Sequence, residues 1–85
     1  MNPLYELLYT RDGHACRHCK SRCDLHPHHV IYRSHQGPDE LTNLITLCAV
    51  CHQGHHDGKL QIDLIKIENS NPVVHFMRLL GWKPQ

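Results

Sequence analysis

The sequence predicts a small α+β fold in which two short strands and the helix after them form a ββα core over residues 25–57. Three observations support it: the chain has 85 residues, short apolar stretches alternate with turn signals, and two Cys-x2-Cys pairs lie on either side of the predicted strands. A chain this short rarely buries enough apolar surface to be stable without disulfides, a metal or a partner chain. We therefore expect residues 1–85 to form one crosslinked domain.

Capping signals predict a helix at each end of the chain. Asn2 and Pro3 mark the start of the first helix, which is about two turns long by its leucine pattern and ends at Gly13. Asn71 and Pro72 repeat the same signal, so a second helix is expected there. It would end at Gly81 and turn three apolar side chains towards the core, namely Val74, Met77 and Leu80.

The middle of the chain is expected to contain the strands. A strand-like stretch around Val30 and Ile31 predicts a strand within Leu25–Tyr32, and a short apolar stretch predicts a second strand over Leu44–Leu47. A loop over Ser34–Thr42 is expected to join them. Cys48–His56 has the pattern of a turn running into a helix. Alternating side chains over Leu60–Ile67 predict a further strand. The expected order is therefore helix, strand, strand, helix, strand, helix.

Composition excludes several classes of protein. With 40% hydrophobic and 20% charged residues, the chain is not expected to be disordered. It has no apolar run of membrane-spanning length, and its first residues lack the basic start and apolar core of a signal peptide. A cytoplasmic, reducing environment is therefore expected, which favours metal binding over disulfides for the five cysteines. A net charge of +1 does not by itself indicate a nucleic-acid partner.

The paired cysteines predict a structural zinc ion. Cys16 and Cys19 form one Cys-x2-Cys pair, and Cys48 and Cys51 form the other. Each pair can point both sulfurs at one ion, and two pairs complete a tetrahedral site without an open position. A redox pair would need only one such motif, usually at a helix start in a βαβ unit. Cys23 is left over and is expected to be a spare thiol.

Several of the ten histidines have the spacing of metal ligands. His28 and His29 are adjacent on a predicted strand, so they should point to opposite faces and do different work. His52 and His56 are four residues apart on a predicted helix and should share one face. His28, His52 and His56 could thus form a three-ligand site with an open position, as catalytic metals have. Because His55 adjoins His56, a shift of the third ligand by one residue stays open.

These motifs together resemble the signature of HNH endonucleases. The likeness extends over residues 16–56, includes both cysteine pairs, and departs at Tyr32, where relatives commonly have proline. It is carried by these segments: His28 to Ser34, Gly37, Asn43 to His52, and His56. The resemblance implies a zinc-stapled ββα-metal fold and an enzyme that hydrolyses DNA phosphodiester bonds with one divalent metal, which could be Mn²⁺, Ni²⁺, Co²⁺, Zn²⁺ or Mg²⁺.

The resemblance also implies a role for each site residue. His29 would be the general base, and His28 and His52, with His56 as the third candidate, would hold the divalent metal. Asn43 would tie down the loop between the strands through backbone hydrogen bonds and so fix the base. The products would carry 5′-phosphate and 3′-hydroxyl ends. The chemistry fits, because phosphodiester hydrolysis needs a base for water and a cation for the developing charge.

Basic side chains near the motif are candidate contacts to a nucleic-acid backbone. Arg33 follows the first predicted strand and could pair with a phosphate. A looser group lies near the first cysteine pair, namely Arg11, Arg17, Lys20 and Arg22. The remaining histidines are expected at the surface: His14, His18, His26, His35 and His75.

Two alternatives without catalysis stay open. The first is a zinc-ribbon-like module that binds DNA or RNA, and the second is a protein-interaction zinc module using Phe76 and Trp82. Neither explains His28, His29 and Asn43 together with the helical histidines. DNA is the expected partner, with no membrane. The sequence does not predict the target, or whether the enzyme would nick DNA or cut both strands. A homodimer or a larger phage or mobile-element assembly also stays open, the latter by analogy with small free-standing relatives.

Overall fold

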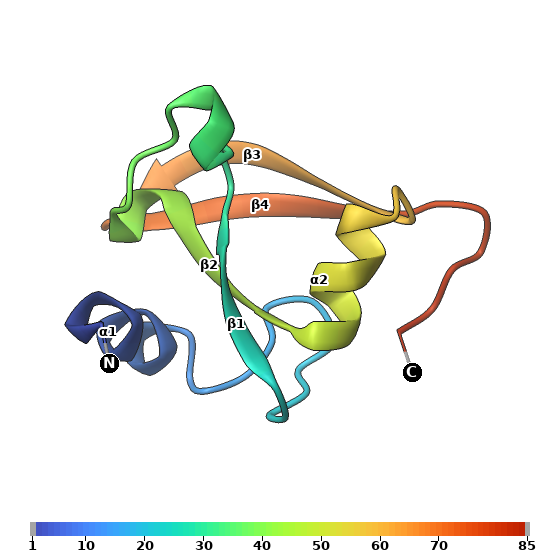
Figure 1. Cartoon of the computed structure of the whole chain (residues 1–85), viewed down its shortest axis with the longest axis horizontal. Coiled ribbons are helices and arrows are strands. Elements are labelled where there is room, and N and C mark those ends of the chain that lie inside the picture. Colours follow the sequence, from blue (N-terminus) through green and yellow to red (C-terminus); the bar gives the residue numbers. More distant parts are fainter. Residues whose placement is uncertain (1, 85) are drawn as a thin grey trace.

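The computed structural model describes residues 2–84, so residues 1 and 85 of the expected domain lie outside the described residues. Within this range the α+β class is confirmed, with two α-helices and two separate antiparallel two-stranded sheets. The order of the helices and strands is α1 (Pro3–Arg11), β1 (Leu25–His29), β2 (Leu44–Cys48), α2 (Ala49–His56), β3 (Leu60–Glu68) and β4 (Asn71–Arg78). Figure 1 shows the β3–β4 hairpin lying across the β1–β2 pair, with α1 and α2 at opposite ends of that pair.

The first helix begins where the capping signal predicts. The side chain of Asn2 accepts a hydrogen bond from the amide of Leu4 at 2.9 Å, and Pro3 occupies the first turn. Leu8 is completely buried, whereas Leu7 is 58% exposed, so the apolar face is narrower than the three leucines suggest. No helix in residues 2–84 combines the length and the apolar character that crossing a membrane requires.

The ββα unit is centred on β2. This strand pairs with β1 in antiparallel register from Leu25↔Cys48 to His29↔Leu44, and all five of its residues are buried. The hydrophobic core contains Ile45 and Leu47 of this strand together with Leu60 at the start of β3. Helix α2 follows β2 directly, and the Cys48 sulfur accepts a hydrogen bond from the amide of Cys51 at its first turn. The unit therefore brings β1 and α2 close together.

The predicted C-terminal helix is wrong, because residues 71–78 form strand β4. Asn69 and Ser70 both have positive φ, at 52° and 61°, and Glu68 pairs with Asn71 on either side of them. Positive φ at both central residues is what a tight hairpin turn of the I′ type requires, and it sends the chain back along β3. The apparent helix-start signal at Asn71 is therefore overridden by pairing with the preceding strand.

A buried ion network joins α1 to β2 and β4. The Asp12 carboxylate, whose side chain is 2% exposed, accepts from Arg11 Nε at 2.9 Å, Arg17 Nη1 at 3.2 Å and the Thr46 amide at 3.0 Å. Arg17 also donates to Asn71 Oδ1 and to the Pro72 carbonyl, both at 2.9 Å. Burial by itself raises the pKa of Asp12, but hydrogen bonds from Arg11 and Thr46 and the charge of Arg17 outweigh burial and lower it.

This network predicts a defined pH dependence of stability. Because the pKa of Asp12 is lower in the folded than in the unfolded chain, its contribution is present above the unfolded pKa and is lost as pH falls through the folded pKa. Asp12→Asn should therefore flatten the dependence of the unfolding free energy on pH in acid. Asp12→Ala, which strands two guanidinium groups, should cost about 3 kcal/mol at neutral pH.

Urea unfolding followed at several pH values would test this prediction. Asp63→Asn is the matched control, because Asp63 is an exposed carboxylate on β3. If Asp12→Asn and Asp63→Asn give the same pH dependence as the parent, the Asp12 network does not stabilise the fold.

Candidate active site and metal centre

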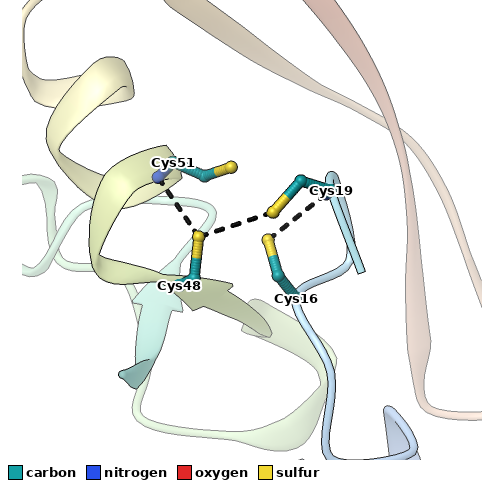
Figure 2. Close-up of side chains that lie close together, drawn as sticks. All are labelled: Cys16, Cys19, Cys48 and Cys51. Carbon is teal, nitrogen blue, oxygen red and sulfur yellow. Dashed lines mark hydrogen bonds between the residues drawn. The ribbon is translucent and has the colours of Figure 1, made fainter. Parts of the chain in front are cut away.

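Four cysteines from two distant segments converge at one end of the core. Cys16 and Cys19 lie on the loop after α1, whereas Cys48 ends β2 and Cys51 lies in the first turn of α2 (Figure 2). Their four sulfur atoms all lie within 4.8 Å of one another. Sulfurs bound to one tetrahedral zinc at about 2.3 Å would lie about 3.8 Å apart, so this donor set fits the ion. The four predicted ligands can therefore hold one zinc.

The surroundings of the cysteines also suit a bound cation. Burial and the neighbouring Cys16 raise the pKa of the Cys51 thiol, which means that negative charge is disfavoured at this site. Four crowded thiolates would repel one another, and a cation bound between them would offset that repulsion. The amides of His18 and Cys19 point at the Cys16 sulfur, at 3.4 and 3.5 Å. Cys23 is exposed and stands apart from this cluster.

His18, expected at the surface, is part of the packing around the cysteines. Its Nδ1 lies 3.3 Å from the Cys51 sulfur, and its ring lies 5.0 Å from that of Phe76 and 6.2 Å from that of Trp82. Phe76 and Trp82 both pack against the core. Spacing along the chain does not predict this contact, because β4 and the C-terminal segment reach His18 only through the tertiary fold.

The histidines gather in a cleft of about 640 Å³ between β1, α2 and the loop after β1. We call it the histidine cleft, and its walls include two tyrosines, Tyr5 of α1 and Tyr32, and these polar residues: His28, His29, Arg33, His52, His55 and His56. Unlike the four cysteines, these histidines do not, within the described residues, form a group of three side chains close enough together to hold one metal ion.

His28 is the buried centre of this cleft. It is 4% exposed, and its Nε2 has no hydrogen-bond partner. Burial, followed by the neighbouring His55 and His52, lowers its pKa to about 3, so its lone pair stays free. A buried ring nitrogen without a partner is costly, and a bound cation would remove that cost.

Two histidines of α2, His52 and His55, have their rings beside that of His28. The ring centroids of His55 and His52 lie 4.8 Å and 5.6 Å from that of His28. His55 Nδ1 lies 2.7 Å from the Leu60 carbonyl and can only donate to it, which leaves Nε2 to accept from the Tyr32 hydroxyl at 2.7 Å. His56 is exposed, and it also borders a smaller hollow of about 400 Å³ with His26 and His52.

His29 and Asn43 lie at the two ends of the loop between β1 and β2. Asn43, 4% exposed, accepts from the Ile31 amide at 2.8 Å and donates to the carbonyls of Ile31 at 3.0 Å and Pro38 at 2.9 Å. The Asn43 carbonyl also accepts from the Val30 amide at 2.8 Å. The loop that follows His29 is therefore fastened to the start of β2.

The predicted basic contacts are placed very differently. Arg33 is 65% exposed at the edge of the histidine cleft, and its Nη2 donates to the Tyr5 hydroxyl at 3.3 Å. Arg11 and Arg17 donate hydrogen bonds inside the fold, to Asp12 and to backbone carbonyls. Lys20 and Arg22 are exposed on the cysteine-rich loop, outside the histidine cleft. Arg33 is thus the basic residue beside the cleft histidines.

Comparison with known proteins agrees with this arrangement. The model of a family described as HNH endonuclease matches residues 16–58. Anaredoxin of Nostoc sp. (strain PCC 7120 / SAG 25.82 / UTEX 2576) is 43% identical over 37 residues, which are 44% of this chain and 49% of that protein. The chain thus spans about half the length of this curated relative. No solved structure gives a significant match.

The family match includes the four converging cysteines and the whole ββα unit. It covers half of the chain and takes in His28, His29, Asn43 and all the α2 histidines. The chain therefore belongs to the HNH endonuclease family.

Proposed function

We propose that the protein is an endonuclease that hydrolyses DNA phosphodiester bonds with the help of a divalent metal. The observation that carries this proposal is the buried Nε2 of His28, which has no hydrogen-bond partner. It lies in the same cleft as His29, a histidine held by the neighbouring loop. A purely structural zinc module needs the cysteines but has no use for this costly arrangement.

The two metals would have different roles and different ligands. Cys16, Cys19, Cys48 and Cys51 would hold a structural zinc that joins the loop after α1 to the start of α2. His28 and His52 would hold the divalent metal. Among the helical histidines the geometry favours His55 over His56 as a third ligand, because the Leu60 carbonyl occupies its Nδ1 and its ring lies 4.8 Å from that of His28. The Tyr32 hydroxyl, now 2.7 Å from His55 Nε2, would give way to the ion. Such a backbone partner orients a metal-binding imidazole.

The chain's own residues would position and activate the reactants. His29 would take the proton of the attacking water as its oxygen bonds to phosphorus, and the bond from phosphorus to the 3′ oxygen would break. Arg33 is placed to pair with a phosphate beside His29. When bound, the divalent metal would stabilise charge on the phosphate and on the leaving oxygen. Asn43 would act indirectly by holding the loop that fixes His29.

Incubating plasmid DNA with the zinc-loaded protein and one added metal at a time tests this proposal. Imidazole ligands suit manganese, cobalt, nickel and zinc better than magnesium, which prefers oxygen. We expect faster cleavage with these transition metals than with magnesium. If magnesium alone gives the fastest cleavage, the three-histidine site is wrong. If the protein binds DNA but does not cut it in the presence of any of these metals, it is a non-catalytic zinc-ribbon-like module instead.

A further inference from the structure

Asp39 lies against the proposed base, and the family signature assigns it no role. Its Oδ1 lies 3.0 Å from His29 Nε2, although His29 ends β1 and Asp39 lies ten residues later, within the loop that follows. We infer that Asp39 is a positioning residue that keeps the hydrogen of His29 on Nε2 and so leaves Nδ1 as the proton acceptor. This inference rests on the proposed function of the same site.

The local charges decide which nitrogen carries the hydrogen. A carboxylate can only accept, so its 3.0 Å contact with Nε2 is favourable only when Nε2 bears a hydrogen. Arg33 Nε donates towards the same nitrogen over a longer distance, 3.3 Å, and this contact competes with the carboxylate, because Nε2 cannot accept from Arg33 while it carries a hydrogen. The shorter contact with Asp39 favours the hydrogen on Nε2, and Arg33 can then pair with Asp39 instead, since its Nη2 lies 3.8 Å from Asp39 Oδ1. A neutral imidazole has one acceptor nitrogen, and here that nitrogen is Nδ1.

The loop places Asp39 firmly although its side chain is 43% exposed. The preceding residue, Pro38, is fastened through its carbonyl to the buried Asn43 side chain. Gly37 packs so closely on the Ile31 and Tyr32 carbonyls that a Cβ at this position would overlap them, and its amide donates to Tyr32 at 2.9 Å. The backbone on the N-terminal side of Asp39 is therefore tied to the segment that follows His29.

An orienting carboxylate would help the reaction in two ways. It keeps the acceptor lone pair on one nitrogen before proton transfer, and it stabilises the imidazolium that forms afterwards. Replacing Asp39 with asparagine removes the charge that stabilises the imidazolium and weakens the tautomer preference, since an amide can accept from Nε2–H through its oxygen or donate to Nε2 through its nitrogen. The change is nearly isosteric, so the loop should keep its shape.

Nitrogen NMR of the histidine side chains tests the inference without any measurement of activity. Uniformly ¹⁵N-labelled, zinc-loaded protein in mildly alkaline buffer should show His29 as the Nε2–H tautomer. The signal is assigned by its loss in His29→Gln. In Asp39→Asn and Asp39→Ala the Nε2–H form should lose its dominance. The matched control is Glu40→Gln, which removes the same charge one residue away and should leave the tautomer unchanged.

Cleavage kinetics then give the functional effect. We expect Asp39→Asn to lower kcat about 100-fold, the low end of what a base contributes, with KM and metal affinity unchanged and Glu40→Gln at the parent rate. A parent His29 in the Nδ1–H form, or an Asp39→Asn variant with the parent tautomer and kcat, would overturn the inference. Zinc content and circular dichroism identify any variant that does not fold. A parent that shows the Nε2–H tautomer but cuts no DNA would contradict the proposed function alone.

Discussion

Cys48→Ser is expected to leave the chain largely unfolded, the largest effect on stability that the structure predicts. Cys48 is 3% exposed, and its sulfur lies 3.6 Å from that of Cys19 and also caps α2. Structural zinc contributes roughly 10–16 kcal/mol in small zinc domains, which matches or exceeds the roughly 5–15 kcal/mol stability of a whole domain. The described hydrophobic core is small, so the fold cannot absorb this loss.

Elemental analysis and circular dichroism of protein purified without added metal would check this result. The parent should contain one zinc per chain, and a strong chelator should unfold it. Cys23→Ser is the matched control, because Cys23 is exposed and lies outside the cluster; it should keep both the zinc and the fold. A folded, zinc-free parent would show that the four cysteines do not form a structural metal site.

His29→Ala is expected to lower the cleavage rate by about 10²–10⁴-fold, which is the usual contribution of a general base. Its side chain is not part of the hydrophobic core and interacts with the exposed Asp39, so the fold should survive the change. Divalent-metal binding should also survive, because the proposed ligands are other histidines. His28→Ala and His52→Ala should instead weaken metal binding, and excess metal should partly restore their activity.

Calorimetric titration of a transition metal into each zinc-loaded variant, combined with plasmid cleavage, separates the two roles. His75→Ala is the control, since His75 is exposed on β4, outside the histidine cleft. If His29→Ala loses metal binding while His28→Ala cuts normally, the two roles are exchanged. If both variants cut as fast as the parent, the histidine cleft is not the active site.

Local sequence signals were sufficient for the elements that depend on near neighbours. The Asn2–Pro3 cap fixes the start of α1 by a hydrogen bond to the next turn, and the apolar stretch Leu44–Leu47 lies within β2. The first strand is displaced from its apolar pair, because β1 ends at His29, just before Val30 and Ile31. The failure at β4 has a clear physical cause. A cap followed by residues at roughly helical spacing is a local signal, whereas the strand forms because Asn69 and Ser70 adopt positive φ and present residues 71–78 to β3.

The chemistry proposed for the site follows from sequence patterns: two Cys-x2-Cys pairs able to share one ion, and adjacent histidines on a strand with others on a helix. Which of these side chains meet depends on the tertiary fold. His55 and His56 have the same chemistry one residue apart, and the Leu60 carbonyl and Tyr32 hydroxyl distinguish them. Asp39 reaches His29 because Asn43 and Gly37 fold the loop back. Spacing along a chain limits which atoms can meet, but loop closure and packing determine which of them do.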